Sequence, residues 1–464
     1  MEAELQKTPQ TDFPQFQEKE LSRKPVCLED SLAALEDYGG IRILKTLIRE
    51  TENFDPRKKS LQDLFLTDSL YKDARKKLAK TLDLWIDLLD NSEKEGNEDI
   101  DKLKDHCFHE CKRVENNISD NLFTIREEIK ELEKTYRVLY SFFANTGKEK
   151  VDFLNLINVN KEDLGDLNSR SSKTVTNELN NHYNTLNLRE SYSLLVLPGY
   201  FGDPQLINAW AAVAHKNKAL LITDFEDSMT YEDLILRLNK SYIQGSEICK
   251  SNVILTCNYI LGRRRSELSM EEDDLYIPAS GAIAGRMTDI EDIPISQGIA
   301  GKKFGSISNA PAVRFDLLKS DLTKLIDMGV VPLIEIDGQV MAFSNRTPYD
   351  GSISELQEYP IVRVFNWVSK VIQQFCNDEA FVIWNATIKS EMTDNIQNFL
   401  GKYKGAGKLY ENYTIKGVNQ DSETKNILVQ IELKPFFAAK NFLIELTGKT
   451  DKGKMTTTWE DNLK

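Results

Sequence analysis

Histidine and cysteine are scarce in this chain, with four and six copies among 464 residues. No apolar run reaches the roughly 18 residues that a membrane-spanning helix needs. The first residues also lack a basic segment followed by an apolar one, so we expect neither membrane insertion nor a secretory signal.

Acidic residues outnumber basic ones by 73 to 59, a formal net charge of −14. This argues against a nucleic-acid partner, because lysine and arginine dominate phosphate binding. Dilute, scattered cysteines are typical of reduced thiols, so we expect a cytoplasmic protein.

Catalytic fingerprints are missing as well. The chain contains no G-x-S-x-G, no H-E-x-x-H and no G-x-G-x-x-G after a strand. Asp224, Glu226 and Asp227 do follow an apolar strand, where an α/β enzyme could hold a carboxylate site. A helix N-terminus explains the same group, since acidic side chains favour that end of the helix dipole. We therefore expect no enzyme and no cofactor, and an enzyme that uses these carboxylates is the alternative from a different class.

Two further patterns suggest ligands but fit them poorly. His106–Cys111 holds two cysteines four apart on one helix face, yet a structural zinc site needs four converging ligands and His106 lies off that face. We expect no metal. The glycine-rich stretches GAIAGRMT and GIAGKKFGS lack the spacing of a phosphate-binding loop, so close-packed turns are the better interpretation.

The hydrophobic pattern divides the chain into a helical first part and an α/β second part. A long helix is expected from about 100 to 143, and from Tyr192 short apolar runs alternate with helical spacing. Asp337-Gly338 predicts a hairpin. The expected fold class is α/β (α+β), a helical N-terminal region followed by a mixed-sheet core with C-terminal strands. The expected segments are a disordered arm (1–27), the helical region (28–185), an α/β domain (186–345), a C-terminal core with terminal strands (346–448) and a polar tail (449–464).

Three features of the second part suggest packing and assembly. PIVRVFNWVSKVIQQF is the most clearly amphipathic helix, and we expect its apolar stripe in the core with Arg363 and Lys370 exposed. Opposite charge blocks at 263–265 and 271–274 fit a solvated loop and a contact between copies equally well. The apolar strands NILVQIEL and NFLIELTG offer edges for pairing with another chain. The candidate assembly contacts are Arg263, Arg264, Arg265, Glu271, Glu272, Ile427, Val429, Ile431, Phe442 and Ile444.

Several of these stretches resemble one family. VVPLIEIDGQVMAFSNRT, RVFNWVSKVIQQF and NILVQIELKPFFAAKNFLIELTGK are similar to segments of the large sheath subunit of type VI secretion systems, the TssC/VipB family, in its Bacteroidetes version. YIPASGAIAGRM is similar to the turn and helix of contractile phage tail sheaths. The resemblance covers about Leu194 to Gly448 and makes the α/β domain a sheath domain.

The resemblance implies a structural role. Such a subunit pairs with a small TssB/VipA-like subunit, self-assembles into a helical sheath on a baseplate and surrounds an Hcp-like inner tube, which contraction propels. A ClpV-like AAA+ unfoldase then recycles it, gripping a helix near the N-terminus for which 27–50 is the candidate here. Two alternatives stay open within structural proteins: a phage-like sheath made of one subunit type, and a helical scaffold centred on 28–145.

Overall fold

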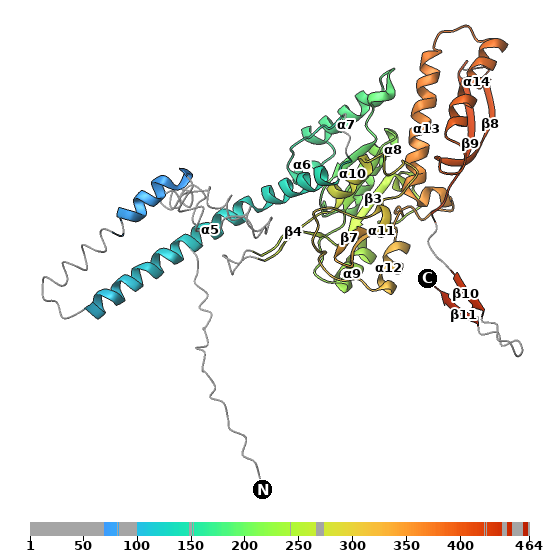
Figure 1. Ribbon diagram of the computed structural model, residues 1–464. Coiled ribbons are helices and arrows are strands. Elements are labelled where there is room, and N and C mark those ends of the chain that lie inside the picture. Colours follow the sequence, from blue (N-terminus) through green and yellow to red (C-terminus); the bar gives the residue numbers. More distant parts are fainter. Residues whose placement is uncertain are drawn as a thin grey trace, which may run out of the picture. The chain divides into compact units, whose positions relative to one another are not determined.

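The computed structural model describes residues 69–80, 82, 100–147, 151, 153–241, 243–265, 273–421, 423, 425–438, 443–447 and 458–462 (Figure 1). The chain divides into two compact units, Met1–Lys130 and Glu131–Lys464, and the boundary falls inside the long helix α5 (Ile100–Asn145). In the first unit, η1 (Ser69–Tyr71) leads into a helix at 72–80. In this unit α5 carries an apolar stripe at helical spacing, made of Ile118, Leu122, Ile125 and Ile129.

A five-stranded sheet forms the centre of the second unit, in the order β1-β2-β3-β6-β7. The first four strands are parallel and β7 runs antiparallel to β6. Asp337 and Gly338 join β6 to β7 with φ of 55° and 74°, the left-handed backbone that a two-residue hairpin turn requires. The predicted hairpin is therefore confirmed. The strands are β1 (Leu194–Leu197), β2 (Leu220–Asp224), β3 (Val253–Cys257), β6 (Val331–Ile336) and β7 (Gln339–Ala342).

Helices cover both faces of this sheet, so its central strands β2 and β3 are buried along their whole length (Figure 1). Leu220 and Ile222 point into one core, with α10 and the end of α5, whereas Leu221 points into the other, around Trp210. The second core is closed by α7, α8, α9 and α12. These helices are α7 (Arg170–Tyr183), α8 (Pro204–Lys216), α9 (Tyr231–Ser241), α10 (Ser280–Thr288) and α12 (Lys319–Asp327).

A third core lies toward the C-terminus. Helices α13 (Tyr359–Asp378) and α14 (Ala386–Lys402) pack against the hairpin of β8 (Tyr410–Gln420) and β9 (Ile427–Pro435). Beyond it, β10 (Leu443–Thr447) pairs antiparallel with β11 (Thr458–Asn462). No helix in the described part of the chain is long and apolar enough to cross a membrane. The remaining elements are α6 (Lys161–Gly165), η2 (Leu188–Glu190), η3 (Ile248–Asn252), β4 (Ile260–Arg263), β5 (Leu275–Ile277), α11 (Gly301–Phe304) and η4 (Ser354–Gln357).

The prediction that Arg363 and Lys370 are exposed is wrong. Their exposed fractions are 7% and 8%, because α13 is shared by two cores: Tyr359 and Val362 belong to the sheet core and Val364 to the C-terminal one. The two cations reach backbone carbonyls across this joint, Arg363 Nη2 donating to Met287 O at 2.7 Å and Lys370 Nζ to Tyr192 O at 2.7 Å. Burial lowers the pKa of Lys370 to about 8.

Lys370 opens a polar stripe along α13. Gln373, Gln374 and Asn377 follow it at helical spacing, and all of them bond to the segment 183–192. Tyr183 Oη donates to Gln373 Oε1 (3.1 Å), the Leu188 amide to Gln374 Oε1 (2.7 Å), and Asn377 Nδ2 to Leu186 O (3.2 Å). One face of α13 is therefore fixed by hydrogen bonds and another by apolar packing.

The stretch GAIAGRMT is a helix, not a turn. Gly281 and Gly285 lie one turn apart on α10, where a Cβ would come within 2.7 Å of Val138 Cγ1 and 2.3 Å of Phe142 O respectively. Both of those residues belong to α5. The two glycines therefore let the end of α5 pack directly against the backbone of α10. This close helix contact accounts for the glycines, and no bound phosphate is needed to explain them.

Candidate assembly surface

A buried charge cluster anchors α5 to the hairpin of β4 and β5. Glu133 Oε1 accepts from Arg263 Nε and from Arg137 Nε, both at 2.8 Å, and Arg137 Nη1 donates to Gly262 O at 2.8 Å. Burial opposes ionisation of Glu133, but the hydrogen bonds and charges of Arg263 and Arg137 outweigh it and lower the pKa of that carboxyl. Arg263 is 8% exposed. Arg263, one of the candidate assembly contacts, therefore forms its ion pair with a residue of the same chain.

The rest of the basic block behaves differently. Arg264 and Arg265 are exposed, and the Arg265 amide donates to the Asp274 carboxylate across the hairpin. Glu271 and Glu272 lie outside the described residues. Arg264 and Arg265 therefore stay predicted contacts between copies of the chain.

The carboxylates of the alternative enzyme site each have a separate partner. Asp224 is fully buried and accepts from the amides of Gly199 and Ser280, both at 2.9 Å, and from the Thr256 hydroxyl. Burial raises the pKa of Asp224, and these hydrogen bonds oppose the rise. The side chain therefore joins the ends of β1, β2 and β3 to the start of α10.

The other two carboxylates form ion pairs. Glu226 pairs with Arg237, and Asp227 Oδ2 accepts from Arg314 Nη2 at 3.1 Å. Burial raises the pKa of Asp227, and the Arg314 charge opposes it. The three carboxylates therefore stabilise three different contacts.

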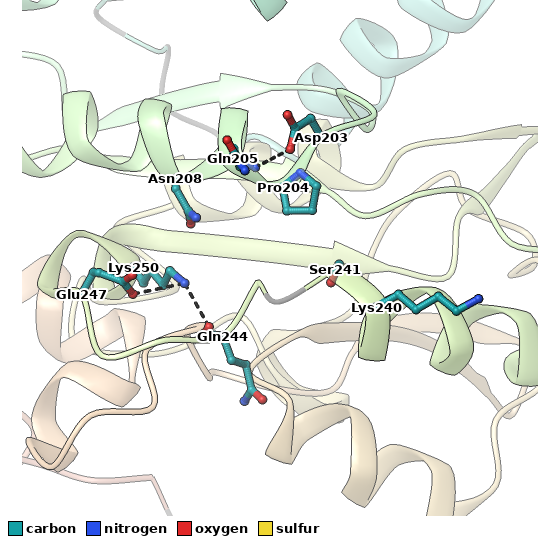
Figure 2. A pocket seen from close by; sticks show the side chains of 9 residues that line it. All are labelled: Asp203, Pro204, Gln205, Asn208, Lys240, Ser241, Gln244, Glu247 and Lys250. Carbon is teal, nitrogen blue, oxygen red and sulfur yellow. Dashed lines mark hydrogen bonds and ion pairs between the residues drawn. The ribbon is translucent and has the colours of Figure 1, made fainter.

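A polar cavity of about 540 Å³ opens elsewhere, between α8, α9 and η3 (Figure 2). Figure 2 shows Asp203 accepting from the Gln205 amide at the N-terminus of α8, while Lys250 Nζ donates to Gln244 O and pairs with Glu247. The buried amine of Lys250 is thus held within its own loop. The carboxylates Asp224, Glu226 and Asp227 do not line this cavity.

The histidine- and cysteine-bearing segment lies on α5. His109 and Cys111 are exposed, and the side chains of His106 and Cys107 lie outside the described residues. Among the residues whose side chains the structure describes, no three histidine, cysteine or acidic side chains are placed to hold a metal ion.

The β8–β9 hairpin carries the predicted strand contacts. Val429 and Ile431 turn toward α13 and α14, and Ile427 is 40% exposed. The opposite face of the hairpin is solvent-exposed and charged, with the ion pairs Lys416–Glu432 (2.6 Å) and Lys434–Glu411 (2.8 Å). In the described part of the chain the two strands pair with each other, and β8 has a further bridge only at its first residue, from Tyr410 to Lys404, so most of one edge of each strand is left for a further strand. Phe442 lies outside the described residues. Ile444 is in β10 opposite Asp461.

Exposed apolar residues that the sequence did not single out add to this surface. Phe381, Val382 and Ile383 connect α13 to α14 with exposed fractions of 106%, 43% and 83%, and Phe381 has a left-handed φ of 68°. A second exposed apolar stretch is 153–157. Neither follows a strand or helix period, which is the signal that sequence reading depends on.

Glu133, Arg263 and Asp224 therefore serve contacts inside the chain, whereas the apolar loops at 153–157 and 381–383 are exposed. Three family models match consecutive parts of the chain: the N-terminal region of TssC/VipB-like proteins at 28–122, the central domain of type VI secretion system TssC/VipB at 124–350, and the TssC/VipB-like C-terminal domain at 358–464. The chain belongs to the TssC/VipB family, and this membership identifies it as a contractile sheath subunit. The resemblance found in the sequence is confirmed.

Solved structures of contractile machines match this chain at low sequence identity. The anti-feeding prophage baseplate matches at 15% identity and TM-score 0.48, covering 68% of this chain and 80% of that one. The helical sheath of the same prophage in its contracted state matches at 14% and 0.48, covering 68% and 82%. The contracted PVC sheath complex of an extracellular contractile injection system matches at 13% and 0.42, covering 69% and 82%. Comparison with curated proteins gave no match.

Proposed function

We propose that this chain is the large subunit of a two-component contractile sheath in the cytoplasm. It pairs with a small TssB/VipA-like subunit, and the pairs assemble helically on a baseplate around an Hcp-like inner tube. Contraction of the sheath then propels the tube, and a ClpV-like unfoldase recycles the subunits. The observation that carries the proposal is the run of TssC/VipB matches from residue 28 to residue 464.

The β8–β9 hairpin supports the proposal physically. A two-stranded sheet is marginal alone and gains stability when further strands extend it. Its apolar face is already covered by α13 and α14, so a neighbour's strand can add at either edge without disturbing the core. Main-chain hydrogen bonds of this kind join subunits firmly and still allow the bodies they connect to rotate.

Co-expression with the small subunit tests the proposal. Negative-stain microscopy is expected to show hollow tubes from the pair and none from this chain alone. Tubes from the chain alone would favour the single-type phage-like sheath, and soluble, unassociated subunits would contradict both. Deleting the residues after Leu433 removes the end of β9 and everything beyond it. This truncation is expected to abolish tubes while the helical signal of α5 persists, and normal tubes from it would exclude these strands as the joint.

The recycling handle stays a proposal as well, because 27–50 lies outside the described residues. Deleting residues 1–50 separates its two possible roles. Tubes that form and contract but then persist with the unfoldase would support the handle. Failure to form tubes would instead assign the segment to the sheath body.

A further inference from the structure

Two cations are buried on one face of α13, and among the described residues no carboxylate stabilises the charge of either. Arg363 donates to Met287 O and Lys370 donates to Tyr192 O, so both of these acceptors are backbone carbonyls. Burial lowers the pKa of Arg363 to about 10. A buried charge is costly unless an opposite charge and hydrogen bonds compensate it. The positive charge on this face of α13 therefore lacks a counter-charge from the described part of the chain.

The guanidinium of Arg363 also has a donor without an acceptor. Arg363 is 7% exposed, yet its Nη1 has no hydrogen-bond partner within the described residues. The same is true of Nδ2 of Asn366, which follows Arg363 by three positions and is its neighbour on the surface of α13. Buried donors of this kind are rare, because leaving one unpaired costs the full desolvation of the group. Two of them therefore lie within one helical turn of each other, beside an uncompensated positive charge.

The chemistry of these two nitrogens selects the ligand that binds them. Both are donors only, whereas a water molecule between them would also need acceptors for its own two hydrogens. A monatomic anion needs no acceptor, and its charge compensates the guanidinium. Both nitrogens are closed off from solvent, so a side chain of another polypeptide does not reach them. These properties together are those of a chloride ion.

We propose that α13 binds a chloride ion between Arg363 Nη1 and Asn366 Nδ2. Arg363 reaches from α13 to Met287 in the last turn of α10, and α13 is shared by the sheet core and the C-terminal core. The ion therefore neutralises a charge at the joint between these two cores. Lys370 lies about 10 Å further along the helix axis, so its amine remains desolvated. The site follows from these residues and does not depend on the proposed function.

The dependence of stability on chloride tests the proposal. Urea unfolding of the full chain is measured in mixtures of sodium chloride and sodium gluconate at constant ionic strength, so that general screening stays the same. A ligand that binds only the folded chain raises the folded-to-unfolded ratio by about tenfold for each tenfold rise in its concentration above the dissociation constant. We expect this response from the wild type. A flat response would assign the two donors to water and overturn the proposal.

A single substitution separates this site from other effects of chloride. Asn366→Asp supplies a negative charge from the chain itself, so the stability of this variant should no longer depend on chloride. Asn377→Asp is the matched control, because Asn377 lies on the same helix and donates to Leu186 O. This control loses a hydrogen bond and should keep the full chloride response. Equal responses from the wild type and Asn366→Asp would place the ion elsewhere and overturn the site.

Bromide gives a direct measurement that needs no variant, so it decides even where Asn366→Asp does not fold. In a crystal of the wild-type chain grown with sodium bromide, the anomalous scattering of the ion locates it. We expect a peak within hydrogen-bonding distance of Arg363 Nη1 and Asn366 Nδ2. Density there without an anomalous signal would show a water molecule and contradict the proposal. A peak together with a flat response in solution would mean binding at crystal concentration only, and would overturn it as well.

Discussion

The buried amine of Lys370 predicts an unusual dependence of stability on pH. An ordinary lysine has a pKa near 10.5, and in the folded chain burial lowers that of Lys370 to about 8. The folded state therefore releases its proton at lower pH than the unfolded state does. Between pH 8 and 10.5 the unfolded chain binds more protons, so the free energy of unfolding rises with pH in this window and the contribution is absent below it.

The size of the effect follows from the shift. Each pH unit well inside the window contributes about 1.36 kcal/mol and the slope is smaller at its edges, so from pH 8 to pH 10 the stability should rise by roughly 2 kcal/mol. Lys370→Met removes the titrating group while keeping a long side chain in the joint. Between the two pH values, the free energy of unfolding of the wild type should rise by about that amount relative to this variant. A difference in packing energy that is the same at both pH values does not affect this comparison.

Urea unfolding followed by tryptophan fluorescence measures the difference, since Trp367 lies on α13 and packs against the C-terminal core. Comparing the two proteins at each pH cancels the titration of tyrosines and cysteines that both share. Lys402→Met is the control, because Lys402 is exposed at the end of α14 and its charge is solvated in both states. A wild-type gain under about 0.5 kcal/mol, far below the linkage value, would refute the claim that the amine is desolvated.

The other predictions concern packing and charge. Gly285→Ala should lower the free energy of unfolding by roughly 1–3 kcal/mol, because its Cβ would meet Phe142 O at 2.3 Å. Gly401→Ala is the control and should be neutral or stabilising, because its Cβ would meet only Tyr413 Oη at 3.7 Å. Thermal unfolding of both variants measures the difference. Arg263→Ala should lower the melting temperature of the free chain, since it removes a partner of buried Glu133, and unchanged melting would contradict the anchor. Arg264→Glu with Arg265→Glu should leave the proposed pairing with the small subunit intact and impair tube formation at low salt; normal tubes would assign the two arginines to inert surface.

Much of the fold could be predicted from local patterns. The strands β1, β2, β3 and β6, the helices α8, α13 and α14, and the turn at Asp337-Gly338 all follow from signals that lie within a few residues of each other. These signals are strong because the sheet is buried on both faces. The order of the strands depends on pairings between residues such as Leu194 and Leu220 or Thr256 and Val331, and the position of α13 on contacts as distant as that of Asn377 with Leu186, which no local pattern encodes.

The errors have the same origin. The pattern of α13 predicts an exposed face for Arg363 and Lys370, because a helix with one apolar stripe usually has one partner, whereas α13 has two. Arg263 was grouped with its two neighbours, although its partner Glu133 is 130 positions away. The glycines of α10 are explained only by a helix that precedes them by more than a hundred residues.

The polar stripe of α13 also has a mechanical consequence. Its four hydrogen bonds to the segment 183–192 are spread along two turns of the helix. A force along the helix axis would stretch all four together, as in shear, so they would share the tension. A force across the axis would instead peel them apart one at a time, starting from Asn377 or Lys370. The joint is therefore stiff in one direction and yields in the other, and a pull applied through the C-terminal hairpin is best resisted when it runs parallel to α13.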